Sequence, residues 1–62
     1  MNWKMIATNP PPRNVVVMTK IDDTRGPRNE QPLKLHATGN LWFVPDGSTY
    51  VYYTPTHWKE MT

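Results

Sequence analysis

Hydrophobic and polar residues alternate most clearly in the second half of the chain. Residues 33–38 (LKLHAT) place an apolar side chain at every second position, which is typical of a strand with one buried face. Gly39-Asn40 and Asp46-Gly47 flank the next apolar run, and tight hairpin turns favour such dipeptides because they need positive φ. We therefore expect a meander of three strands: Leu33–Thr38, Leu41–Pro45 and Ser48–Tyr53.

The first half contains one further strand-like run, Val15–Ile21 (VVVMTKI), which is rich in β-branched residues. Three consecutive prolines, Pro10–Pro12, interrupt regular structure, so residues 1–13 are expected to form an extended arm. Residues 22–32 (DDTRGPRNEQP) are polar and contain glycine and proline, which predicts a mobile loop. The expected fold class is all-β, because no helical periodicity extends beyond one or two turns. Residues 1–62 then form a single domain, an antiparallel meander of about four strands. It is either an open sheet or a small barrel, with the arm and the C-terminal tail packed on it.

The two turns set a register in which Leu35 faces Val44 and Phe43 faces Tyr50. Because paired residues share one face of a sheet, this register sorts the side chains into two sets. The first set is expected to form the core and contains Leu33, Leu35, Ala37, Trp42, Val44, Val51 and Tyr53. The second set contains Lys34, His36, Thr38, Leu41, Phe43, Tyr50 and Tyr52.

The second set holds more large apolar groups than a chain leaves in water without a reason. One explanation is that the chain ends, with Trp3, Met5, Ile6 and Trp58, fold over this face and extend the core. The other is a partner site or a homodimer interface, since tyrosine combines a large contact area with a polar group. We expect the first, because a chain this short needs every apolar contact it has.

Length and composition restrict the class of function. With 62 residues, of which 37% are hydrophobic, such a chain buries only about 60% of the surface that it exposes when unfolded. An enzyme with a buried cleft is therefore not expected. Cysteine is absent, so no disulfide adds to the core. The longest apolar run is Val15–Met18, whereas a membrane-spanning helix needs roughly 20 apolar residues. The sequence also lacks an apolar stretch of signal-peptide type near its start, so a cytosolic location is expected.

Few residues offer catalytic or metal-binding chemistry. His36 and His57 are the only histidines, and no carboxylates share a spacing with them that would suggest a metal site. Ser48 is the only serine and directly follows a turn, without a base placed to activate it. We therefore expect no enzyme, no metal and no cofactor.

Two motifs near the chain ends carry a family resemblance. Residues 3–10 (WKMIATNP) form a W-x-x-I-x-T-x-P segment, and residues 55–58 read PTHW. With the Val15–Val17 strand and Trp42, they resemble a family of small phage and prophage proteins of unknown function. The family often has a Lys-Asp-Gly turn and a Met-x-Leu-Pro ending, which this chain lacks. The resemblance implies a phage or prophage origin and a cytoplasmic location in a bacterial host. It implies no activity.

The end motifs are expected to be structural. The stiff segment Thr54–Thr56 can turn the chain and direct its end back at the sheet. Trp3 and Trp58 would then close the domain from its two ends. The residues assigned to this structural role are Trp3, Trp42, His57 and Trp58.

The leading functional hypothesis is a non-enzymatic protein that binds a host or phage protein, with inhibition of that partner as one expected action. The candidate contact residues are Arg25, Arg28, Lys34, His36, Tyr50 and Tyr52. The alternative is single-stranded nucleic acid stacked on the aromatic face. Dispersed lysines and arginines count against it, because phosphate binding draws its strength from clustered cations. A homodimer is a further alternative that the sequence leaves undecided.

Overall fold

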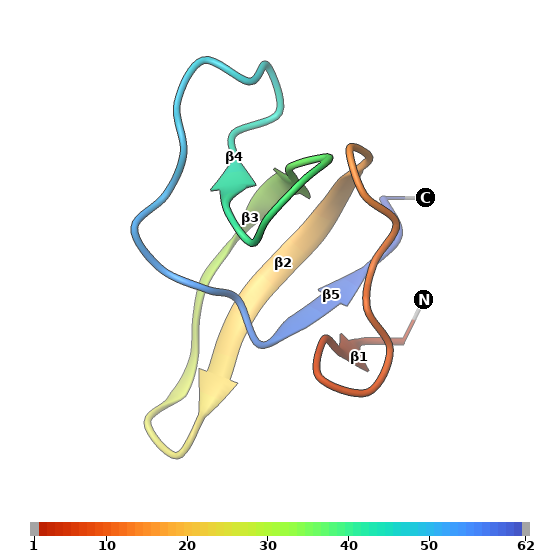
Figure 1. The fold of residues 1–62 in the computed structure, drawn as a ribbon. Helices are drawn as coiled ribbons and strands as arrows, with labels where there is room; N and C mark the ends of the chain where they lie inside the picture. Colours follow the sequence, from red (N-terminus) through yellow and green to blue (C-terminus); the bar gives the residue numbers. More distant parts are fainter. Residues whose placement is uncertain (1, 62) are drawn as a thin grey trace.

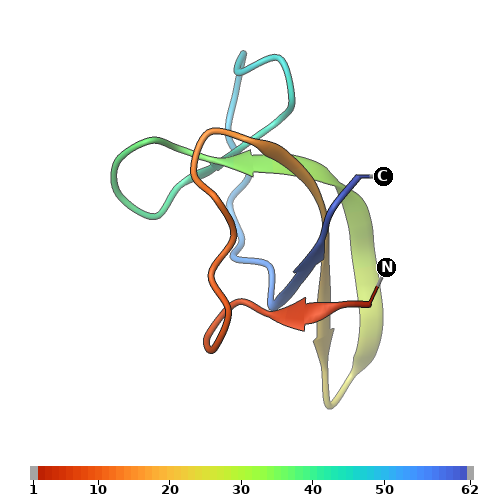
Figure 2. The same cartoon turned by 90° about the vertical axis from the view of Figure 1, so that its right-hand side faces the viewer.

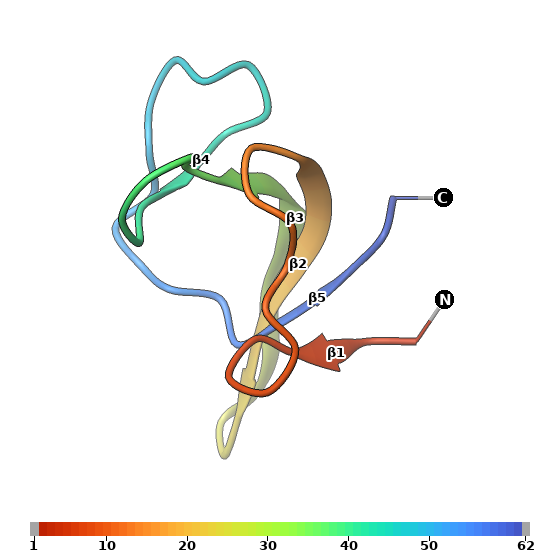
Figure 3. The same cartoon turned by 45° about the vertical axis from the view of Figure 1, so that its right-hand side comes forward.

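The computed structural model describes residues 2–61 as one antiparallel sheet (Figure 1). The strands are β1 (Lys4–Met5), β2 (Val16–Asp23), β3 (Gly26–Leu35), β4 (Trp42–Phe43) and β5 (His57–Lys59). Their order across the sheet is β1-β5-β2-β3-β4, so the last strand lies between the first two. This confirms the all-β prediction and gives an open sheet. The sheet is curled, and the segment between β1 and β2 runs across its concave side (Figures 2 and 3).

The core lies on the concave side of the sheet. In β2 the burial alternates, with Val17, Thr19 and Ile21 buried and the residues between them half-buried. The main apolar cluster is Val17, Leu33, Leu35, Trp42 and Trp58, with Ile6, Val44, Val51 and Tyr53 packed against it. Six of the seven residues expected in the core are in this cluster or against it. The exception is Ala37, which is exposed.

The prediction of a mobile loop over residues 22–32 is wrong. These residues form the end of β2, a tight turn and most of β3. Asp23 pairs with Gly26, whose φ is +93°, and Asn29, with φ of +56°, accommodates a bulge between Thr19 and Ile21. Asparagine tolerates this left-handed conformation better than most residues, so a polar segment can pair as a strand here.

Proline did not prevent β3 from forming either. Pro27 and Pro32 pair with Asp22 and Met18 of β2. In the described part of the chain, β4 pairs only with the last residues of β3, so both prolines lie where β3 is an edge strand. Edge strands tolerate proline because one side of the backbone needs no donor.

The pairing of β3 with β4 differs from the predicted register by two residues. Leu35 pairs with Trp42 instead of Val44, and His36 donates a backbone hydrogen bond to Leu41 at 2.9 Å. The loop is therefore longer than the expected Gly39-Asn40 turn. A shift of two residues leaves every side chain on its expected face, since strand side chains repeat with a period of two.

Residues 48–53 do not form the expected third strand of the meander. Phe43 pairs with Tyr50 as predicted, but as an isolated bridge. Two backbone hydrogen bonds frame that bridge, from Val44 to Thr49 and from Val51 to Trp42. Beyond Val51 the chain turns away from β4 and crosses to β5 (Figure 1).

The chain ends do not cover the second set of side chains, contrary to our expectation. Trp58 is in the core and Ile6 packs against it, both on the concave side. Met5 is itself about half exposed (51%). The extended arm also contributes a strand, since β1 pairs with β5. The convex face near β4 is thus open.

The two end motifs meet, but Trp3 and Trp58 do not close the domain together, because they lie on opposite faces of the sheet. Lys4 pairs with Trp58, so these two side chains share a face, and the neighbouring Trp3 belongs to the other face. The Trp58 indole is buried and its Nε1 donates to the Asn9 carbonyl oxygen at 2.6 Å. His57 Nδ1 lies 2.7 Å from the Thr56 hydroxyl oxygen. Trp42 is also buried in the core.

Candidate functional site

Four rings line up on the convex face where β3, β4 and the following segment meet. Successive ring centroids are 5.1, 5.7 and 5.4 Å apart, from His36 through Phe43 and Tyr50 to Tyr52. Tyr52 is 92% exposed and Tyr50 40% exposed. We call these four residues the aromatic row. Phe43 was absent from our candidate residues, although the predicted register already placed it on this face.

A small hollow lies beside the row. Its volume is about 230 Å³, and its lining includes Asn14, Lys34, His36 and Phe43. His36 Nδ1 lies 3.0 Å from the Thr38 carbonyl oxygen, which holds the ring. The Lys34 side chain provides the positive charge of this hollow.

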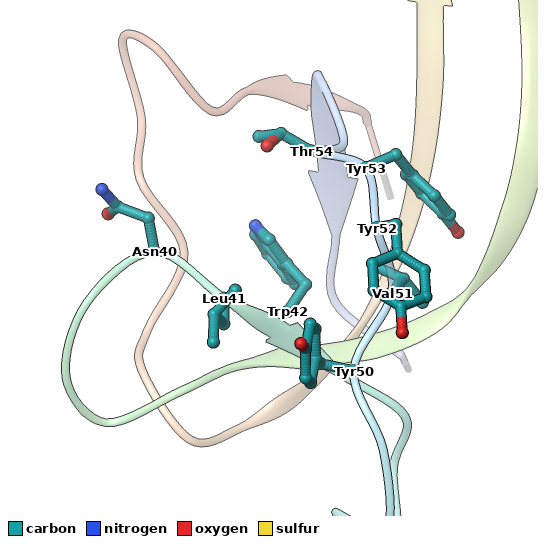
Figure 4. Close-up of a pocket in the computed structure, with 8 residues that line it drawn as sticks. All are labelled: Asn40, Leu41, Trp42, Tyr50, Val51, Tyr52, Tyr53 and Thr54. Carbon is teal, nitrogen blue, oxygen red and sulfur yellow. The ribbon is translucent and has the colours of Figure 1, made fainter.

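A larger depression adjoins the row, and Tyr50 and Tyr52 of the row are among its lining residues. One hollow of about 270 Å³ separates residues 40–42 from residues 50–54 (Figure 4). An adjoining hollow of about 310 Å³ extends to Ile6, Pro10, Pro11 and Arg13. Asn40, Trp42 and Thr54 line both hollows, so the two form one depression, which we call the Trp42 groove. Figure 4 shows the Trp42 indole at its centre, between Asn40 and Thr54.

Arg13 connects the groove to the row and was not among the candidate residues. Its Nη1 donates to the carbonyl oxygens of His36 (3.1 Å) and Gly39 (2.7 Å). These bonds hold the loop between β3 and β4. The sequence offers no signal for this contact, because 23 residues or more separate the partners.

The structure separates the candidate residues into two groups. Lys34, His36, Tyr50 and Tyr52 lie together at the row. Arg25 and Arg28 lie in the tip of the β2–β3 hairpin, at the opposite end of the molecule from the turn after β4 (Figure 1).

The hairpin tip forms a local set of polar contacts around Asp23. Arg28 binds Asp23 with two hydrogen bonds of 2.9 and 3.1 Å, and the backbone N–H of Arg25 donates to the same carboxylate. The hydrogen bonds from Arg28, and then that from Arg25, lower the pKa of Asp23 to about 2. The same ion pair raises the pKa of Arg28.

Further cations share the convex face with the row. Lys20 and Lys59 belong to this face, because Met18 pairs with Lys59 and Lys20 pairs with His57. Their Nζ atoms lie 4.4 and 4.7 Å from the Trp3 ring centroid. Lys20 also forms an ion pair with Asp22 at 3.2 Å.

Within residues 2–61, no three His, Asp or Glu side chains are close enough together to hold a metal ion. No helix in that part of the chain is long and apolar enough to cross a membrane. Ser48 donates its backbone N–H to Asp46 at 2.9 Å, which stabilises the turn and lowers the pKa of that carboxyl.

The fold and its open aromatic face define a small all-β domain with a candidate binding surface. Comparison of the chain with protein-family models, curated proteins and solved structures gives no match. The resemblance to small phage and prophage proteins therefore stays a prediction.

Proposed function

We propose that this chain is a non-enzymatic binding protein of phage or prophage origin, which acts on a host or phage protein in the bacterial cytoplasm. The proposed contact surface is the aromatic row with Lys34 beside it. Inhibition of the bound protein is the expected action. A single observation carries the proposal: four neighbouring rings are left in contact with water in a chain with little apolar surface to spare.

The exposure of the row has an energetic cost that a partner can recover. Burying apolar surface contributes about 25 cal/mol per Å². Tyr50 and Tyr52 are suited to this, because tyrosine offers a large ring and a hydroxyl group and is enriched among residues that dominate binding energy. Leu41, 48% exposed, is part of the same face and extends the apolar area.

The ionisable side chains support binding in preference to catalysis. His36 and His57 lie in different parts of the molecule and each contacts a neighbouring threonine. Asp23 and Asp46 are hydrogen-bonded within their own turns. A nucleophile activated by a base would need a shared geometry that these contacts do not provide.

Single-stranded nucleic acid is the second candidate ligand. It is favoured by the hollow at Lys34 and His36, which could hold a phosphate while bases stack on Phe43 and Tyr50. The lysines Lys20 and Lys59 lie on the same face of the sheet. This candidate shares its surface with the first, so one experiment separates the two.

The experiment is affinity capture from bacterial lysate, with and without nuclease, with three forms of the tagged protein. The forms are the natural sequence, Tyr50→Ser with Tyr52→Ser, and Arg25→Ala with Arg28→Ala as the matched control at the hairpin tip. A protein that the natural chain and the control retain, and that the tyrosine variant loses in both conditions, supports the proposal. Retention that nuclease abolishes supports nucleic acid instead. If the arginine variant alone fails to retain the captured protein, the contact surface is the hairpin tip and the proposal is contradicted.

A further inference from the structure

The pairing between β4 and the chain that follows it stops early. The last backbone hydrogen bond runs from the Val51 N–H to the Trp42 carbonyl oxygen at 2.9 Å. In a continued antiparallel ladder, Asn40 and Tyr53 would form the next hydrogen-bonded pair. The residues described by the structure show no such bond, and the two segments separate instead. Among the residues that the structure describes, neither Asn40 nor Tyr53 has a backbone–backbone hydrogen bond, and both residues line the Trp42 groove.

The side chains of the groove are mostly apolar. The Trp42 indole, which is only 3% exposed, lies beneath it, and its walls include Ile6, Pro10 and Leu41. The two hollows of about 270 and 310 Å³ adjoin, so the groove is elongated. An elongated depression with apolar walls and unpaired backbone groups matches the needs of an extended polypeptide, which offers its own backbone groups and alternating side chains.

The charge of the groove is of one sign. Arg13 is the only charged residue among those that line either hollow. The hydrogen bonds of its guanidinium group all use Nη1, and within residues 2–61 it forms no ion pair. A carboxylate is the complementary group, because a guanidinium binds it with paired hydrogen bonds.

We infer that the Trp42 groove binds an extended segment of the partner protein, which places an apolar side chain against the exposed Leu41 and a carboxylate at Arg13. This inference rests on the proposed function in that the partner is a protein. It extends the contact surface from Tyr50 and Tyr52, which belong to the row and also line the groove, as far as Arg13, and it specifies the chemistry of the segment. The backbone of the segment completes the hydrogen bonds that Asn40 and Tyr53 leave open.

The test begins with selection of peptides from a displayed library of random twelve-residue sequences on the immobilised full chain. The peptide with the highest enrichment is then synthesised and titrated into the ¹⁵N-labelled protein. We expect an acidic residue near alternating apolar residues in the peptide. We also expect the largest amide shifts at Asn40, Tyr53 and Thr54, with a shift of the Trp42 indole N–H.

Two variants and one control decide the result. Arg13→Gln should weaken peptide binding about tenfold, the effect of losing a contact of about 1.4 kcal/mol. Thr54→Trp fills the groove without adding charge and should also weaken peptide binding, and this variant does not depend on the loop that Arg13 holds. Arg25→Gln at the hairpin tip is the matched control and should leave the affinity unchanged. The dispersion of the amide spectrum shows whether each variant is folded.

Three outcomes overturn the inference, and each differs from failure of the proposed function. Peptides that shift His36 and Phe43 but not Asn40 or Thr54, with no effect of Arg13→Gln or Thr54→Trp, leave the row as the binding surface and exclude the groove. Groove amides that shift with protein concentration alone identify a second copy of the chain as the occupant. Absence of any enriched peptide also excludes the groove, whereas the lysate capture with the natural sequence decides separately whether the chain binds a protein.

Discussion

The aromatic row and the hairpin tip are both exposed, but their contacts differ. At the tip, Asp23 binds Arg28 through both carboxylate oxygens and accepts the N–H of Arg25. At the row, the rings contact one another and Tyr52 remains 92% exposed. The tip therefore pairs Asp23 with Arg28 within a few residues of sequence, while the row leaves apolar surface uncovered. A charged segment is exposed by default, so it says less about binding than an exposed ring does.

The largest expected effect concerns the core on which both regions depend. Trp58→Ala should lower the free energy of unfolding by about 3–5 kcal/mol. Trp58 is 5% exposed and β5 lies between β1 and β2, so its loss removes the packing that joins the two ends of the chain. Urea denaturation followed by circular dichroism measures the change.

Trp58→Phe is the matched control for the core. It keeps most of the ring packing and removes the hydrogen bond from Nε1 to the Asn9 carbonyl oxygen. Because one such bond contributes about 1 kcal/mol, the loss should be smaller than for alanine. Equal losses of stability in the two variants would show that Trp58 stabilises the fold through its hydrogen bond and not through its packing.

Two neighbouring tyrosines test the difference between the open face and the core directly. Tyr53 packs against the core cluster and its hydroxyl contacts the Gln31 side chain, whereas Tyr52 points to solvent. Tyr53→Ala should cost about 2 kcal/mol of stability, and Tyr52→Ala should change it by less than about 0.5 kcal/mol. Thermal unfolding of the two variants, compared with the natural sequence, measures the change in stability. Comparable losses would mean that the row contributes to folding and is no free surface.

Much of this fold could be predicted from the alternation of residues 33–38 and from the pairing of Phe43 with Tyr50. The side chains were assigned to the correct faces of the sheet despite the error in register, because the error was two residues and strand side chains repeat with a period of two. The segment 22–32 could not be predicted in this way. Its pairing depends on Gly26 and Asn29 at positive φ and on long-range contact with β2, while its composition is that of a loop.

The candidate surface was predicted in part. The sequence placed Lys34, His36, Tyr50 and Tyr52 on one face, but it could not show whether the chain ends cover that face. That outcome depends on where β5 inserts, and pairing between residues about 40 apart in sequence leaves no local pattern. The Trp42 groove was not predicted, because it arises where a hairpin stops pairing.

A buried hydroxyl group tests how the bulge connects the hairpin to the core. Thr19 is fully buried, and its Oγ1 donates to the Gln31 carbonyl oxygen at 2.8 Å. Thr19→Val keeps the shape of the side chain and should cost about 1 kcal/mol, because the carbonyl loses its donor. Urea denaturation of Thr19→Val, with the exposed Thr24→Val as control, measures it. An unchanged midpoint would mean that this hydrogen bond does not stabilise the bulge.

The smallest expected effect is the response of the hairpin tip to acid. The pKa of Asp23 is about 2 in the folded chain, against an ordinary value of 3.8. The unfolded chain therefore binds more protons between these values, so the stabilisation from this carboxylate is complete above about pH 4 and is lost as the pH falls towards 2. The carboxylate is exposed, so solvent screens the interaction and the effect on global stability should be slight.

Titration of the Asp23 carboxyl ¹³C signal should give a midpoint near 2, and Arg28→Gln should move it back towards 3.8. The Tyr52 ring signals should stay constant over the same range, because the contacts of the row involve no carboxylate. If the ring signals follow the Asp23 titration, the two regions are coupled and the contrast between the ion-paired tip and an independent open face does not hold.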